Sequence, residues 1–285
     1  MSIPELSLNQ ATTRPYQLAP TVEAAARRGL RWIGLWTGPV EEIGAASARR
    51  LLDDAGMAAS SLCRVGFVAD KTGLEFVAAM DETRRALETA HIVGAPQLTF
   101  IAGALPAEDR RIAAAEERVR DALVELVPEA RAAGVRLALE PLHPLFVTSR
   151  SAITTLAQAL RVIDGLPRDA VGVLVDAYAT CWDPDLRESL RAAGDRIAGV
   201  QVSDFALPLP FPDNMNGRML PGDGELDLAG FVRDTVDAGW SGPVEVEVFS
   251  DAVWALPLDT IVQRMIDGAA RALAAAVADP QEHLA

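Results

Sequence analysis

The chain is poor in cysteine, in histidine and in basic residues. Its 285 residues include two cysteines and three histidines, too few for a disulfide framework or a cysteine-rich zinc knuckle. Lysine and arginine number 26 against 40 acidic residues, which gives a formal net charge of −14. Nucleic acid and anionic lipid are captured by basic surfaces, so we expect neither a nucleic-acid nor a membrane partner.

Long apolar runs are also missing from the sequence. No stretch reaches the roughly 20 apolar residues that a membrane-spanning helix requires, and the first thirty residues do not resemble a signal peptide. Half of all residues are nonetheless apolar, which is enough for a large buried core. We therefore expect a cytoplasmic protein with one domain over residues 1–279. The segment 280–285 has no apolar period and is predicted to be a flexible tail.

Eight short runs typical of β-strands alternate with longer stretches of helical periodicity, such as Glu116–Ala133 and Ile153–Ile163. Glycine follows several helical stretches, as at Gly94 and Gly134, where it relieves the left-handed residue past a helix end. Eight strands, each followed by a helix, predict an α/β protein with a single (β/α)8 TIM barrel. A doubly wound open sheet is the alternative, but it usually has fewer strands. The predicted strands are Leu6–Asn9, Arg31–Trp36, Ser60–Arg64, Gln97–Gly103, Val135–Leu142, Val171–Asp176, Ile197–Asp204 and Val244–Ser250.

One connection is much longer than the others. It runs from Asp204 to Leu226 and contains three prolines, at 208, 210 and 212, which are incompatible with a helix there. A TIM barrel places such a loop on its C-terminal face, where active sites lie. Arg218 is the charge in this loop that we expect to close over a polar substrate, although a solvated loop arginine is the alternative.

Oxygen-bearing side chains interrupt four successive strands that should be buried. These are Glu140, Asp176, Gln201 and Glu247, and Glu245 lies one layer deeper on the face of Glu247. A single carboxylate at a strand end is more often a helix cap or a salt-bridge partner, and we expect Glu245 to pair with an arginine. Three carboxylates converging with an amide repel one another, and a divalent cation removes that repulsion. Oxygen-only ligation favours Mn²⁺ or Mg²⁺, with Co²⁺ as a further candidate.

Short motifs surround these four positions. They are Glu140-Pro-Leu-His-Pro144, Val175-Asp176-Ala-Tyr178, Trp182-Asp-Pro-Asp-Leu186, Val202-Ser-Asp204, Pro221-Gly-Asp-Gly224 and Gly242-Pro-Val-Glu-Val-Glu-Val-Phe-Ser250. Together they resemble the sugar phosphate isomerase/epimerase family, in the xylose isomerase-like TIM barrel superfamily. The resemblance runs nearly end to end, from Leu6 through Ser250.

The resemblance implies that Glu140, Asp176, Gln201 and Glu247 ligate a divalent metal, and that Glu140 and Glu247 are also the catalytic acid/base pair. Two positions depart from the family pattern. Gln201 stands where the family usually has a ligating histidine, and Ala179 stands where the epimerases have a histidine that contacts substrate. Histidine-rich DNA-repair endonucleases of the same superfamily fit this acidic, histidine-poor chain badly.

The resemblance therefore implies a divalent-metal-dependent isomerase or epimerase of a small sugar or polyhydroxy ketone, acting through an enediolate. Expulsion of a β-hydroxyl would instead make the protein a lyase, either of the inosose-dehydratase kind or one that eliminates across a 3-keto sugar. A barrel that binds a ligand without catalysis is the third alternative, suggested by Ala179 and Gln201.

Five residues are expected to contact the substrate, which we take to be a small sugar or keto acid, because no glycine-rich phosphate loop is present. Each has a structural alternative, such as a turn asparagine or a tryptophan packed at the rim. The oligomeric state is not readable, so a homo-oligomer stays open. The predicted substrate contacts are Asn9, Trp36, Arg64, His143 and Arg218.

Overall fold

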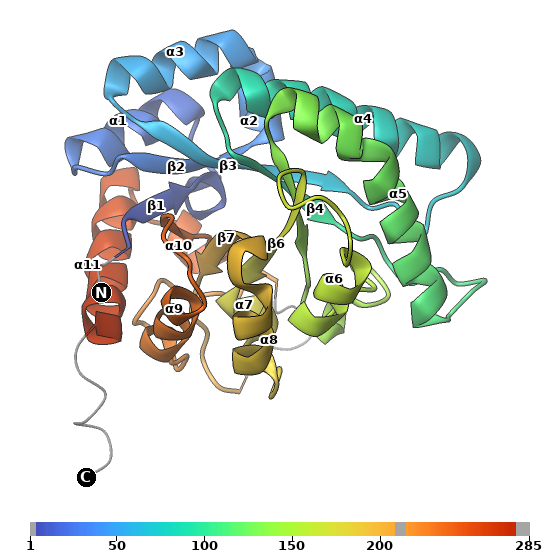
Figure 1. The fold of residues 1–285 in the computed structure, drawn as a ribbon. Helices are drawn as coiled ribbons and strands as arrows, with labels where there is room; N and C mark the ends of the chain where they lie inside the picture. Colours follow the sequence, from blue (N-terminus) through green and yellow to red (C-terminus); the bar gives the residue numbers. More distant parts are fainter. Residues whose placement is uncertain (1–3, 209–214, 278–285) are drawn as a thin grey trace.

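Eight parallel strands close on themselves. The computed structural model describes residues 4–208 and 215–277, and in this part of the chain the strands pair in sequence order until the eighth meets the first. The predicted (β/α)8 barrel is confirmed, and Figure 1 shows its helices arranged around the strands. The strands are β1 (Leu6–Asn9), β2 (Trp32–Trp36), β3 (Ala58–Gly66), β4 (Gln97–Ile101), β5 (Arg136–Glu140), β6 (Val171–Asp176), β7 (Ile197–Val202) and β8 (Val244–Val246).

Helices connect successive strands and cover the outside of the barrel (Figure 1). The α-helices are α1 (Leu18–Arg27), α2 (Thr37–Ile43), α3 (Ala45–Ala55), α4 (Gly73–Val93), α5 (Ile112–Ala133), α6 (Leu156–Val162), α7 (Ala177–Thr180), α8 (Leu186–Ala193), α9 (Leu228–Asp237), α10 (Asp251–Trp254) and α11 (Leu258–Val277). Short 3-10 turns are η1 (Gln10–Thr13), η2 (Pro144–Phe146) and η3 (Gly194–Arg196). α11 packs against α9 and α1, so the last helix completes the ring beside the first. Within residues 4–208 and 215–277, no helix combines the length and the apolarity needed to cross a bilayer.

Several predicted strands extend too far at their C-terminal ends. The runs predicted over 97–103, 135–142 and 197–204 end at Ile101, Glu140 and Val202. Apolar residues continue past these points because the chain is still buried as it enters the loops at the barrel mouth. The strand predicted over 60–64 is instead too short, since β3 extends at both ends.

Capping residues explain two further boundary errors. The strand predicted over Val244–Ser250 ends at Val246, and Ser250 starts α10 by accepting a hydrogen bond from the backbone N–H of Val253 at 3.3 Å. The helix predicted over Ile153–Ile163 begins later, because Thr155 caps α6. The predicted tail 280–285 lies outside the described residues.

Two kinds of side chain fill the barrel wall. Residues pointing outward, such as Leu8, Ile33 and Phe100, are fully buried beneath the helices and form the main apolar core. Inside the barrel, a small apolar cluster is made of Ala138, Leu174 and Ala198. The rest of the interior carries polar side chains, which are costly to bury without partners. These polar side chains continue to the C-terminal end of the barrel, which we call the barrel mouth.

Candidate active site

A cavity of about 610 Å³ opens at the C-terminal ends of the strands, and it is the size of pocket that holds a small molecule. Five of the residues predicted from the sequence line it. They are Trp36, Arg64, Glu140, Arg218 and Glu247. The barrel fold explains this convergence, because every parallel strand ends at the same face.

Glu140 ends β5 and faces the cavity with no hydrogen bond or ion pair to any described residue. Its side chain is buried. Burial raises the pKa of Glu140 well above its ordinary value, repulsion from Glu247 and Asp176 raises it further, and Arg218 opposes the rise. A carboxyl group in this environment tends to keep its proton and can act as an acid.

Glu247 lies just past β8 and beside a buried guanidinium. Arg218 Nη1 is 3.7 Å from Glu247 Oε2 and 3.1 Å from Asp176 Oδ2, so one arginine bridges two of the predicted ligands. Burial is the main reason that the pKa of Glu247 rises to about 8, while Arg218 lowers it and Asp176 raises it. Burial also raises the pKa of Asp176, again against the effect of Arg218. Arg218 is therefore the main counter-charge of the site.

Arg218 is held in this position by the long loop after β7. The Asp204 carboxylate accepts hydrogen bonds from four backbone N–H groups, at Phe205, Gly222, Gly224 and Leu226, over 2.9–3.1 Å. A Cβ at Gly224 would lie 2.4 Å from the carbonyl oxygen of Phe205 and 2.5 Å from Asp204 Oδ1, so this turn requires glycine. Arg218 is thus a buried, fixed residue, and the solvated alternative is wrong.

Glu245 lies one layer below and is held by neutral donors. Asn9 Nδ2 and Ser60 Oγ each donate to it at 2.9 Å, and Gln201 Nε2 donates to its Oε2 at 3.3 Å. The expected arginine partner is wrong, because three strands already supply amide and hydroxyl donors here. Gly34 completes the layer, since a Cβ there would lie 2.4 Å from Glu245 Oε2.

Two predicted substrate contacts lie outside the described cavity lining. Asn9 is fully buried, and its Oδ1 accepts from Ala11 N and from Trp36 Nε1, so its side chain orders the site from below. His143 caps η2, accepting from Leu145 N at 3.3 Å, and packs among aromatic rings that include Tyr178. Burial and Arg218 lower the pKa of His143. In this structure both residues support the site and do not line it.

Sequence reasoning missed several residues that do line the cavity. Arg14, Cys63 and Arg150 are among them, and the pKa of the Cys63 thiol is raised by burial and by nearby glutamates. Arg14 and Arg150 follow no strand directly and belong to no motif. Only the folded barrel brings them together with Arg64.

The donor set fits a divalent cation by its chemistry. Gln201 Oε1 is buried without a hydrogen-bond partner, while its Nε2 donates to Glu247 Oε1 at 3.4 Å. An unpartnered amide oxygen on a residue that contacts the buried carboxylate of Glu247 suits a hard, oxygen-seeking ion. In the part of the chain that the structure describes, no three acidic, histidine or cysteine side chains stand close enough together to hold a metal. Arg218 is the cation that contacts Asp176 and Glu247 here.

Two curated relatives are enzymes that act on small molecules, by their names. A 3-dehydroshikimate dehydratase of Pseudomonas aeruginosa is 32% identical over 142 residues, which is 48% of this chain and 21% of that protein. An inosose isomerase of Bacillus subtilis is 28% identical over 189 residues, covering 65% of this chain and 63% of that protein. The chain therefore spans about a fifth of the dehydratase and less than two thirds of the isomerase.

Solved structures agree on the fold. A protein from Sinorhizobium meliloti 1021 superposes with a TM-score of 0.89 at 35% identity, covering 95% of this chain and 99% of that one. A structure of the IolI protein with a bound zinc atom has a TM-score of 0.84 at 21% identity, over 96% and 100% of the two chains. The family model described as xylose isomerase-like TIM barrel matches residues 22–273. The chain belongs to the xylose isomerase-like TIM barrel family.

Proposed function

We propose that this protein is a divalent-metal-dependent isomerase or epimerase of a small sugar or polyhydroxy ketone. The observation that carries the proposal is the pair Glu140 and Glu247, which are buried, face one cavity and have raised pKa values. A pair of carboxyl groups in unequal surroundings can remove a proton with one member and return it with the other. The family and its isomerase relatives support the same reading.

The surroundings of the two glutamates suggest how the work is divided. Glu247 lies beside Arg218, which favours its ionised form, so it is the better base. Glu140 has no such partner among the described residues and is the better acid. Glu247 would take the proton next to the ketone, and Glu140 would protonate the substrate oxygen or the opposite carbon face. In an isomerisation, Glu247 returns its proton to the neighbouring carbon and Glu140 regains one from the other oxygen, so both residues are restored. In an epimerisation Glu247 ends protonated and Glu140 ionised, and proton exchange with water restores the pair before the next cycle.

The metal would be held by Glu140, Asp176, Gln201 and Glu247, with Mn²⁺ or Mg²⁺ favoured by the oxygen-only donors. The zinc-bearing IolI structure supports a divalent ion of some kind. When bound, the ion supplies positive charge where the substrate carbonyl gains electron density. Asn9 and Ser60 hold Glu245 in the layer below, which keeps the Gln201 amide oriented.

Dehydration is the second candidate, and the match to a 3-dehydroshikimate dehydratase favours it. Proton removal by Glu247 would be the same first step. The electron pair would then expel a β-hydroxyl group, which Glu140 protonates, so that water leaves and an alkene forms. The site geometry is compatible with either outcome, and the product decides between them.

Solvent-deuterium exchange tests the proposal. The Mn²⁺-loaded protein is incubated in D₂O with a panel of ketohexoses, inosose and cyclic 3-keto acids, and NMR and mass spectrometry follow the label. Deuterium at the carbon next to the ketone, in a product that has not lost water, supports an isomerase or epimerase. A product that has lost water supports a dehydratase. The exchange should fall by about 10²–10⁴ in Glu247→Gln. Exchange that persists in folded Glu247→Gln contradicts its role as base.

A further inference from the structure

The cavity carries more positive charge than the chain as a whole would suggest. Four arginines and two glutamates line it, in a protein where acidic residues outnumber basic ones by 40 to 26. One of the arginines, Arg218, is accounted for by its contacts with Asp176 and Glu247. The other three are Arg14, Arg64 and Arg150.

These three arginines, which we call the cavity arginines, have no carboxylate within ion-pairing distance in residues 4–208 and 215–277. Arginines on the outer surface behave differently: Arg84 contacts two glutamates on α5, and Arg131 makes two hydrogen bonds to Asp169. A guanidinium has five donors and no acceptor, so it usually finds an anion or a carbonyl when it is drawn into a protein. Arg64 and Arg150 are half-buried and Arg14 is exposed at the mouth, so all three leave donors available to a ligand.

Aromatic rings hold two of the cavity arginines in place. Arg64 lies over the rings of Trp36 and Phe67, with its Cζ 5.4 and 4.8 Å from their centroids. Arg14 lies 5.3 Å from the centroid of Trp254. These contacts with aromatic rings restrain the positions of the two guanidinium groups, which reduces the entropy lost when an anion binds.

Like charges crowd the third cavity arginine. Burial lowers the pKa of Arg150, and both Arg64 and Arg218 lower it further, with no acidic group acting in the opposite direction. Such crowding costs stability in the free protein, and a binding site is where a protein tolerates that cost. A bound anion would relieve it.

We propose that the substrate carries a carboxylate, which the cavity arginines bind while its ketone faces Glu140 and Glu247. This inference rests on the proposed function for the location of the ketone. Arg64 is close enough to both glutamates to lower their pKa values, so the anion site and the proton-transfer site adjoin. A planar carboxylate matches the fork of an arginine, and the sequence has no glycine-rich loop of the kind that binds phosphate. The substrate class is thus a polyhydroxy keto acid.

Binding of matched ring compounds tests this inference. Quinate and myo-inositol are both six-membered polyhydroxy rings, but only quinate has a carboxylate, and myo-inositol 1-phosphate supplies the phosphate comparison. Isothermal titration with the Mn²⁺-loaded protein should show quinate binding at least tenfold more tightly than either of the others. Arg64→Gln should weaken quinate binding about tenfold and leave myo-inositol binding unchanged. The exposed Arg85→Gln is the matched control and should change neither.

Three results would overturn the inference: no preference for quinate over myo-inositol, tighter binding of the phosphate, or unchanged quinate affinity in Arg64→Gln. The melting temperature separates ligand binding from a structural role, since a structural Arg64 would leave Arg64→Gln less stable, whereas we expect equal or greater stability. The deuterium exchange experiment tests the proposed function separately from the carboxylate site. Exchange with neutral ketones alone would support proton transfer but contradict a carboxylate on the substrate. Quinate binding without any exchange would support the carboxylate site but contradict proton transfer.

Discussion

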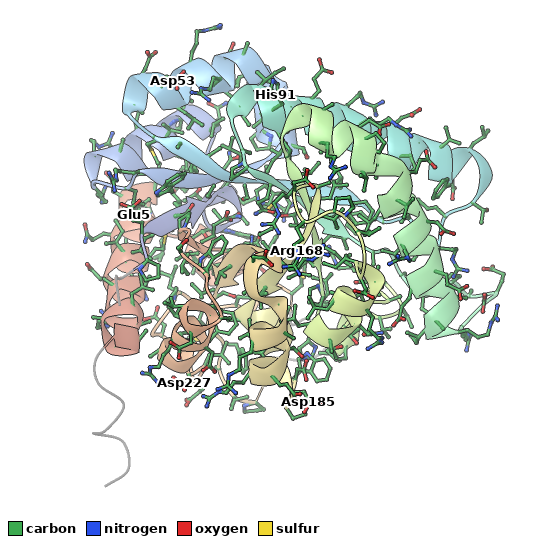
Figure 2. All side chains as sticks on the ribbon, in the orientation of Figure 1. Glu5, Asp53, His91, Arg168, Asp185 and Asp227 are labelled. Atoms are coloured by element: carbon green, nitrogen blue, oxygen red, sulfur yellow. The ribbon has the colours of Figure 1, made fainter. Side chains whose placement is uncertain are left out.

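The two ends of the barrel treat charge in opposite ways. At the N-terminal rim, ion pairs such as Arg31 with Glu5 and Arg131 with Asp169 are exposed and complete. Glu5, labelled in Figure 2, lies at the outer edge of the molecule beside β1. At the C-terminal mouth, carboxylates are buried around one arginine, and the cavity arginines have no carboxylate partner among the described residues.

This difference separates exposed, paired charge from buried charge that lines a cavity. An exposed ion pair is worth little because water screens it, whereas a buried charge is expensive unless it has a partner. The mouth retains the expensive arrangement, which agrees with the rule that catalytic residues of such barrels lie at the C-terminal face.

The largest effect should come from removing the bridging arginine. Arg218→Met leaves Asp176 and Glu247 buried without their counter-charge, so we expect the free energy of unfolding to fall by about 3–5 kcal/mol. Arg31→Met at the opposite rim should cost less than about 1 kcal/mol. Urea unfolding of both variants gives the measurement. Similar losses in the two variants would erase the contrast between the rims.

The pH dependence of stability should come next in size. In chelator-treated protein the pKa of Glu247 is about 8, above its ordinary value of 4.5, so the folded chain keeps a proton that the unfolded chain loses. Stability present below pH 4.5 is therefore lost as the pH rises to about 8. We expect a fall of roughly 4 kcal/mol between pH 5 and 8.5, using 1.36 kcal/mol per pKa unit.

Urea unfolding across this pH range measures that fall, and Glu247→Gln should reduce it, leaving the part that the raised pKa values of Glu140 and Asp176 contribute. The variant cannot lose a proton at this position, so its stability should vary less with pH. Stability that increases between pH 5 and 8.5 in the wild-type protein would show that Glu247 is ionised throughout.

Metal addition should give a smaller gain. Mn²⁺ at one hundred times its Kd should stabilise the chelator-treated protein by about 2.7 kcal/mol, since the unfolded chain has no formed site. Gln201→Leu should reduce this gain by weakening binding. Gln97→Leu is the matched control, because Gln97 is also a buried amide without hydrogen-bond partners in the described structure, yet it lies at the start of β4. Equal gains in the two variants would remove Gln201 from the predicted ligand set.

The smallest effect belongs to the outer surface. Asp169→Asn removes one side of the exposed pair with Arg131, and we expect no measurable change in melting temperature at 150 mM salt. A clear fall in the melting temperature would mean that the exposed ion pair of Arg131 and Asp169 contributes more to stability than its exposure suggests.

The sequence predicted the barrel and pointed to five residues that line the cavity, because both depend on local patterns. Apolar periodicity identified every strand, and Glu140 and Glu247 stood out as charges on strands that should be buried. The ends of the strands were less predictable, since burial continues into the loops at the mouth. Predicting the strands and the two glutamates needed no knowledge of which strands lie side by side.

Other features depend on distances that one sequence does not contain. Asn9 and Ser60 hold Glu245 from strands that are far apart in the chain, so no local pattern indicates that neutral donors replace an arginine. The same is true of Arg14 and Arg150, whose positions carry no motif. Arg218 could be assigned to the site, but its burial depends on Asp204 fixing the loop.

That loop has a consequence for engineering this barrel. Because Arg218 comes from the connection after β7, the strands alone do not carry the charge balance of the mouth. Replacing this loop with the corresponding loop of another barrel would bring in the specificity of that barrel, but it would also remove the Arg218 guanidinium unless the new loop carries an arginine at the same position. A chimera should therefore keep an arginine at position 218 and an aspartate at position 204, whatever new binding surface it is given.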